Sequence, residues 1–170
     1  KKATKDILSR TKELSTPVDY SDELTALSTA YTNLENSKKQ YKQVVNPSEE
    51  FVMQRILTVD DVADARAVTE DQDPNGNLHK AGGYTSTIYF ESKTVNQSDV
   101  YVSGKYADVL IDKGTDAGGA IEVYENVEDA EKRRDYLATY DGTIYANGTH
   151  TVIGTVLVRT SNELTATQQK

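Results

Sequence analysis

Cysteine and tryptophan are absent from this chain of 170 residues, and methionine occurs once. Without cysteine the protein has no disulfides, no thiol chemistry and no cysteine-based zinc site. This absence fits an exported protein of bacteria that avoid cysteine as well as it fits a cytosolic protein, so it leaves the compartment open. The absence of tryptophan disfavours a carbohydrate cleft, although the many carboxylates leave a pair of catalytic acids open.

Positive charge is also scarce, because 19 Lys and Arg stand against 27 Asp and Glu, giving a formal net charge of −8. Nucleic acids require a basic surface, so neither DNA nor RNA is an expected partner. Acidic membrane surfaces are disfavoured for the same reason. The sequence holds no run of about 18 apolar residues. The chain starts at Lys1 without Met, so we expect a processed form that reaches a membrane only through a missing N-terminal anchor.

The N-terminal part, residues 1–46, is predicted to be a helical arm or stalk. A short helix over 3–14 is followed by a break at Pro17, and a longer helix begins at Ser21 or Asp22. The apolar residues of the longer helix alternate at spacings of three and four, as in a heptad seam interrupted by Lys38. They are Leu24, Leu27, Tyr31, Leu34, Tyr41 and Val45.

Three interpretations of this seam are open. The first helix folds back on it as a helical hairpin, or a second copy of the chain pairs with it as a homodimer. Alternatively, it is the buried stripe of an ordinary amphipathic helix on the flank of the domain.

Asn46-Pro47 ends the helical arm, and residues 47–170 predict an α+β domain. Ser48 caps a helix whose apolar positions continue to about Val62. Strands are expected where the apolar spacing changes to two, and further helices follow capping residues. The expected strands are 84–90, 109–112, 120–125 and 149–160, and the expected helices are 127–140 and 163–169. Strand, helix and strand over 120–160 form one unit, which gives a sheet of three or four strands with helices packed on it.

The loop before the first expected strand resembles the opening of a calcium loop. Asp71, Asp73 and Asn75 alternate as ligands one, three and five, Gly76 follows at position six, and Asn77 offers a carbonyl at position seven. Carboxylate and amide oxygens are the ligands that calcium prefers. The sequence therefore predicts a metal site, with calcium as its ion.

The match to a calcium loop ends at position twelve, where Gly82 stands in place of the bidentate Glu. Pro74 stiffens the backbone at position four, so the last ligand has to come from Glu70 or from a distant carboxylate. Asp, Pro, Asn and Gly are also preferred turn residues, so a tight turn that joins a helix to a strand is the alternative interpretation.

The residue types that carry catalysis are sparse. The two histidines, His79 and His150, are far apart in the sequence and lie near no nucleophile motif. Eleven tyrosines stand against two phenylalanines. Six of them lie on or beside expected strands: Tyr84, Tyr89, Tyr101, Tyr106, Tyr124 and Tyr145. They form either an exposed face for binding protein or glycan, or core packing with the hydroxyls at the surface.

Three segments together resemble a family of uncharacterised proteins exported by Gram-positive bacteria. Some members are lipoproteins, and some are loosely labelled as homologues of extracellular-matrix-binding proteins. The segments are Ala-Val-Thr-Glu-Asp-Gln-Asp-Pro-Asn-Gly-Asn-Leu-His-Lys-Ala-Gly-Gly-Tyr (67–84), Gly-Gly-Ala-Ile-Glu-Val-Tyr with Glu-Asp-Ala-Glu-Lys-Arg (118–133), and Gly-Thr-Val-Leu-Val-Arg-Thr-Ser-Asn-Glu-Leu-Thr-Ala (154–166). The resemblance spans roughly 48–170 and implies export and tethering at the cell surface. It assigns no catalytic residue.

The sequence thus favours a non-enzymatic, secreted or cell-surface module for binding or adhesion, whose helical arm acts as a spacer or a self-association element. Its expected partner is an extracellular protein or glycan. The alternative is a small hydrolase, calcium-dependent or carboxylate-based, that uses the residues around Asp71 and Asp73.

Overall fold

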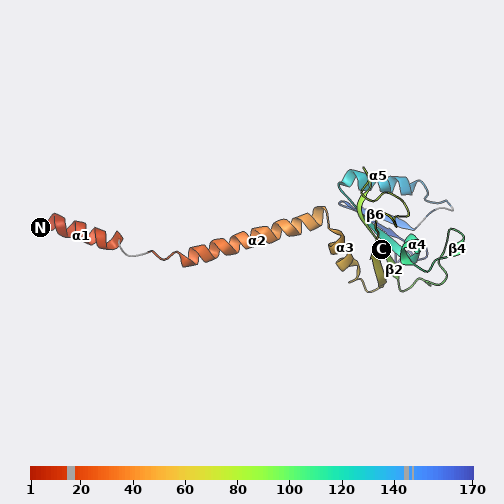
Figure 1. Cartoon of the computed structure of the whole chain (residues 1–170), viewed down its shortest axis with the longest axis horizontal. Helices are drawn as coiled ribbons and strands as arrows, with labels where there is room; N and C mark the ends of the chain where they lie inside the picture. Colours follow the sequence, from red (N-terminus) through yellow and green to blue (C-terminus); the bar gives the residue numbers. More distant parts are fainter. Residues whose placement is uncertain (15–17, 144–145, 147) are drawn as a thin grey trace. The chain divides into compact units, whose positions relative to one another are not determined.

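The computed structural model describes residues 1–14, 18–143, 146 and 148–170 (Figure 1). The predicted break at Pro17 and the residue Tyr145 therefore lie outside the described residues. The chain divides into two compact units, residues 1–40 and 41–170. The first unit holds helix α1 (Lys2–Leu14) and most of helix α2 (Ser21–Val45), so both expected N-terminal helices are confirmed.

The second unit is built on one antiparallel sheet of five strands in the order β1-β2-β5-β7-β6. The strands are β1 (Val62–Ala67), β2 (Tyr84–Ser92), β5 (Gly118–Tyr124), β6 (Thr149–Ile153) and β7 (Val156–Thr160). A separate two-stranded ribbon joins β3 (Tyr101–Val102) and β4 (Lys105–Tyr106). The predicted α+β class is confirmed, with five strands in the main sheet where three or four were expected.

The helices of this unit begin where the sequence places capping residues. Helix α3 (Glu49–Ile56) starts after Ser48, whose side chain accepts a hydrogen bond from the Phe51 N–H. Helix α5 (Val127–Ala138) starts after Asn126, whose side chain caps it in the same way. Such caps satisfy backbone donors that have no partner inside the helix. Between β4 and β5 lie the short helix α4 (Leu110–Lys113) and the 3-10 turn η1 (Gly114–Ala117).

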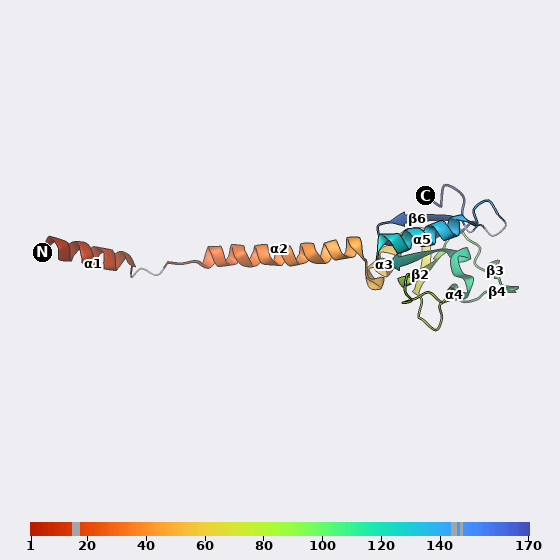
Figure 2. The same cartoon turned by 90° about the horizontal axis from the view of Figure 1, so that it is seen from above.

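The sheet has two faces, because side chains along a strand alternate between its sides. On one, the α3 face, apolar residues of β2 and β5 pack against Val52 and Ile56 of α3. On the other, the α5 face, Leu157 of β7 and Tyr124 of β5 pack against Ala130 of α5. Figure 2 shows α5 running alongside β6.

The expected extension of the third helix to Val62 is wrong. Helix α3 ends at Ile56, and Val62–Ala67 forms β1 at the edge of the sheet. The segment reads Val-Ala-Asp-Ala-Arg-Ala, which has little intrinsic strand preference. Pairing with β2 overrides that preference. The loop 68–83 therefore joins two strands, where a helix-to-strand connection was expected.

The single strand expected over 149–160 is also wrong, because this segment is a hairpin of β6 and β7. Its two-residue loop, Gly154-Thr155, has Gly154 at φ 61°, and glycine is the residue that adopts this backbone without strain. The strand β7 is central, as expected, but β6 is an edge. Helix α5 joins β5 to β6, and these two strands run parallel in the sheet, because each is antiparallel to β7, which lies between them.

Two smaller expectations fail for local reasons. The strand expected over 109–112 is the helix α4, which buries Leu110 and Lys113. The helix expected over 163–169 is a series of turns, since so short a segment has little helical stability of its own.

Candidate functional site

The predicted calcium loop is organised around one carboxylate, that of Asp73. Its Oδ1 accepts hydrogen bonds from the Asn75 N–H at 3.0 Å and the Tyr84 hydroxyl at 2.5 Å. Its Oδ2 accepts from the N–H groups of Asn77 at 2.5 Å and Leu78 at 2.8 Å. Both oxygens are therefore engaged by donors of the protein itself, as in a turn closed by an aspartate side chain.

The other three predicted ligands are placed differently. Asp71 is exposed and accepts a hydrogen bond from the Thr69 hydroxyl at 2.5 Å. The Asn75 amide donates to the Tyr89 hydroxyl at 3.3 Å, and Asn77 contacts Asp73 through its backbone. Within the described ranges, His, Asp and Glu side chains form no group of three or more that could hold a metal ion. The calcium site stays a prediction.

The electrostatics of this loop follow from the same contacts. Partial burial raises the pKa of the Asp73 carboxyl, but the hydrogen bonds from Tyr84 and from three backbone N–H groups outweigh it, so the pKa lies below its ordinary value. Burial, followed by the bond to Asp73, raises the pKa of Tyr84. Burial raises the pKa of Tyr89 to about 12. Asp73 is thus a stabilised carboxylate, the Tyr84 hydroxyl donates to it, and the Tyr89 hydroxyl accepts from the Asn75 amide.

The two histidines lie in separate ion pairs. His79 has φ 59°, and its ring nitrogens lie 2.6 Å from Glu70 Oε1 and 3.0 Å from the Thr85 carbonyl oxygen. Both partners accept hydrogen bonds, so the arrangement favours the protonated ring, in which both nitrogens donate. The hydrogen bond to Glu70 is the main reason why the pKa of His79 lies above its ordinary value. His150, on β6, lies 3.4 Å from Asp141.

A buried charged cluster occupies the α5 face. Glu122 of β5 is 1% exposed and accepts hydrogen bonds from Arg159 Nη1 at 2.9 Å and the Tyr124 hydroxyl at 2.7 Å. Arg133 of α5 adds an ion pair, with Nε 3.4 Å from Glu122 Oε2. Burial lowers the pKa of Arg133, but the charge of Glu122 outweighs it and raises the pKa. The cluster ties β5, β7 and α5 together.

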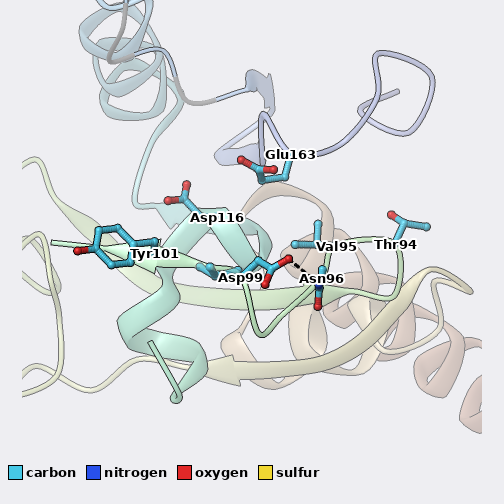
Figure 3. Close-up of a pocket in the computed structure, with 8 residues that line it drawn as sticks. Thr94, Val95, Asn96, Asp99, Tyr101, Asp116 and Glu163 are labelled. Carbon is cyan, nitrogen blue, oxygen red and sulfur yellow. Dashed lines mark hydrogen bonds between the residues drawn. The ribbon is translucent and has the colours of Figure 1, made fainter. Parts of the chain in front are cut away.

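An acidic pocket of about 280 Å³ lies beside this cluster (Figure 3). Asp99, Asp116 and Glu163 come to it from three different segments, and the Asn96 amide donates to Asp99 at 2.6 Å. Burial, with the nearby charge of Glu163, raises the pKa of Asp116. The pocket suits a positively charged group, but its carboxylates are spread too widely to form a metal centre.

The tyrosines do not form one exposed face. Tyr84, Tyr89 and Tyr124 are at most 3% exposed and belong to the core, with their hydroxyls bonded to the polar groups described above. Tyr101 and Tyr106 are exposed and stack edge to face across the β3–β4 ribbon. Core packing is therefore the correct interpretation for the three tyrosines of β2 and β5, with the difference that their hydroxyls are buried.

An apolar groove of about 420 Å³ lies on the α3 face, over β5, β7 and β6. Helix α3 packs against β1 and β2, and its residues Val52 and Ile56 also reach Ile121 of β5, so that β7 and β6 are the strands left partly exposed on this face. The strand residues that line the groove are Ile121, Ile153, Val156 and Val158. The far wall is Val44 and Pro47, at the end of α2, with Phe51, Val52, Arg55, Ile56 and Val59. Ile153 and Val44 are 67% and 75% exposed.

This groove was missed by sequence reasoning, since its two walls come from segments more than 60 residues apart. The alternation of Val and Leu along β7 contains no information on which face of the sheet a helix covers. The one local signal is Ile153, a large apolar residue beside the Gly154-Thr155 turn.

The strand β6, which borders the groove, is an open edge. Within the described part of the chain no strand pairs with its outer side. Its pairing with β7 is unbroken from Thr149 to Ile153, and its sequence, Thr-His-Thr-Val-Ile, contains no Lys, Pro or bulge. Lys, Pro and bulges are the features with which proteins usually block an edge strand, and β6 lacks all three. Thr149, Thr151 and Ile153 are exposed and share the face of the groove.

No protein-family model, curated protein or solved structure matches this chain. Among the residues that the structure describes, no helix combines the length and the apolar character needed to cross a membrane. The groove, the open edge and the chemistry of their residues are therefore the features from which a function is inferred.

Proposed function

We propose that residues 47–170 form a non-enzymatic binding module that takes an extended segment of a protein partner along β6. The partner's backbone pairs with the outer edge of β6, and its alternate side chains enter the apolar groove. The observation that carries the proposal is the coincidence of an unblocked edge strand with an uncovered apolar half-face. Strand addition to an exposed edge is a recurrent mode of peptide recognition, and exposed apolar surfaces mark interaction sites.

The opposite edge of the sheet supports the choice of β6. Strand β1 has an irregularity between Val62 and Asp64, and Asp64 forms an exposed ion pair with Arg66 at 3.3 Å. A bulge and charged side chains on the edge discourage a further strand. The β1 edge is thus protected against pairing with a further strand, whereas the β6 edge lacks such protection.

The charge around the groove indicates the chemistry of the partner. Arg55 is the one charged residue among those described that line it, and its guanidinium lies 5.2 Å from the centroid of the Phe51 ring. A cation held in this way pairs with a carboxylate. The expected segment therefore alternates apolar residues and carries an Asp or Glu where it passes Arg55.

The setting that we propose is the cell surface of a Gram-positive bacterium, or its surroundings after secretion. The resemblance of residues 48–170 to exported proteins and lipoproteins supports it, and the absence of cysteine is compatible with it. In this setting the helical arm is a spacer between the module and its anchor. The alternative, a hydrolase acting through Asp71 and Asp73, gains little support from Asp73, because its depressed pKa makes it a poor proton donor.

The proposal is tested by selecting a displayed library of random peptides on the whole protein. Selected peptides should alternate apolar residues, contain an acidic residue and shift the amide NMR signals of β6. Ile153→Lys places a charge at the open edge and should weaken binding at least about tenfold, with stability changed by no more than about 0.5 kcal/mol.

The matched control is Val109→Lys, at an exposed apolar residue that does not line the groove. It should bind the selected peptides as the wild type does. The proposal fails if no peptide is enriched, or if the enriched peptides bind Ile153→Lys as well as they bind the wild type.

A further inference from the structure

Four large side chains of α2 form an exposed stripe. Leu24, Leu27, Tyr31 and Leu34 are 64%, 67%, 65% and 58% exposed, and none of the residues of α2 is buried. Their spacing of three, four and three places them on one side of the helix, as in the seam of a coiled coil. An apolar stripe of this length is available for packing against a second helix.

The opposite side of α2 is polar. The hydroxyls of Thr25, Thr29 and Thr32 donate to carbonyl oxygens four residues earlier in the same helix. Most of the stability of a helix in a protein comes from packing of its apolar side. The stripe is therefore the side of α2 that requires a cover.

Charge is distributed unevenly along α2, and this distribution indicates what covers the stripe. The first turn holds Asp22 and Glu23, and the second half holds Lys38 and Lys39. Lys38 continues the heptad seam and pairs with Glu35 of its own helix at 3.0 Å. In a parallel pair of such helices, Lys38 would face Lys38 and the acidic turns would lie together. An antiparallel pair brings each acidic turn beside the basic half of the other helix.

We propose that α2 pairs antiparallel with α2 of a second copy of this chain. The two-fold axis passes beside the middle of the stripe, so that Leu24 of one copy lies against Leu34 of the other, and Leu27 against Tyr31. Lys38 then reaches the acidic first turn of the second helix. This pairing is independent of the groove and of the function proposed for it.

The first test is the mass in solution, measured by sedimentation equilibrium on the whole chain over a range of concentrations. The wild type should approach the mass of two chains. Leu27→Asp, which puts a charge into the stripe, should have the mass of one. Thr29→Asp, which puts the same charge on the outer side, should behave as the wild type. A single-chain mass for the wild type throughout, or a Leu27→Asp variant that still forms the dimer, overturns the proposal.

The second test is the orientation, which spin labels on the outer side of the helix report. Because the chain has no native Cys, Thr29→Cys and Asn36→Cys each carry a single label. About the proposed axis the two Thr29 labels lie at the same height, whereas the two Asn36 labels are offset along the helix by roughly 21 Å (about 14 residues at 1.5 Å each). The Asn36 distance should therefore be clearly the longer. Equal distances for the two variants overturn the antiparallel pairing.

Discussion

The two faces of the sheet bury different kinds of side chain and are covered to different extents. The α5 face is polar at its centre, where buried Glu122 forms ion pairs with Arg133 and Arg159 and accepts a hydrogen bond from the Tyr124 hydroxyl. The α3 face is apolar, and helix α3 covers only half of it. Buried polar groups need specific partners, whereas an apolar surface can be covered by any surface of matching shape. The α5 face therefore specifies the fold, and the α3 face leaves a surface for a partner.

The strongest test of this difference is Glu122→Gln on the α5 face. The substitution leaves the buried Arg159 and the partly buried Arg133 without the carboxylate that pairs with both, so we expect it to lower the free energy of unfolding by about 3–5 kcal/mol, measured by urea denaturation. Glu125→Gln, at an exposed residue of the same segment, is the control and should change it by less than about 0.5 kcal/mol. Equal, small effects of the two variants would show that the charged cluster does not specify the fold.

Neighbouring residues of β7 compare the faces more directly. Leu157 is fully buried on the α5 face, and Val158 is partly buried in the wall of the groove. Leu157→Ala should lower the free energy of unfolding by about 2–5 kcal/mol, because it opens a cavity in a covered core. Val158→Ala should cost less than about 1 kcal/mol, since solvent already reaches the groove. A large loss for Val158→Ala would mean that the α3 face is closed in solution.

The smallest of the three effects concerns Asp73, at the margin of the α5 face. Asp73→Asn should lower the free energy of unfolding at pH 7 by about 1–3 kcal/mol, because the amide loses charged hydrogen bonds to Tyr84 and to backbone N–H groups. The folded-state pKa lies below the unfolded value of about 3.9, so the difference from the wild type is constant at higher pH and shrinks as the pH falls through the folded pKa.

Thermal melts from pH 2 to 7, at steps of about one unit, measure this dependence. Asp71→Asn is the control, because Asp71 is exposed and lacks these contacts. A pH dependence shared by both variants would contradict a special role for Asp73. Melts of the same proteins in calcium and in EDTA test the predicted calcium site, since a bound ion raises the melting temperature.

The sequence predicts those parts of the fold whose signals are local. The capping residues Ser48 and Asn126 predict the starts of α3 and α5, and the alternation of residue types over 84–90 predicts β2. Strand β1 could not be predicted, because a segment rich in Ala, Asp and Arg becomes a strand only through its neighbour. The β6–β7 hairpin could have been predicted from the sequence, because a Gly-Thr pair between two runs of alternating apolar residues is a hairpin signal.

The candidate site was less accessible from the sequence than the fold. The sequence marked Asp73 only as one of four ligands of a predicted calcium site, and its hydrogen bond with Tyr84 could not be inferred from spacing. The groove depends on which half of the sheet α3 covers, and that is decided by packing over long sequence separations. The open surface is therefore lined by aliphatic residues such as Ile153 and Val44, which belong to no sequence motif.

Thr155, in the turn between β6 and β7, links the end of the long helix to the centre of the sheet. Its hydroxyl donates to the Val45 carbonyl oxygen at 2.9 Å, and its own carbonyl oxygen accepts from the Tyr124 N–H at 2.8 Å. One residue of the hairpin turn therefore fastens the C-terminal end of α2 to β5. Val44 and Ile153, on opposite walls of the groove, are thus kept near each other by hydrogen bonds as well as by packing.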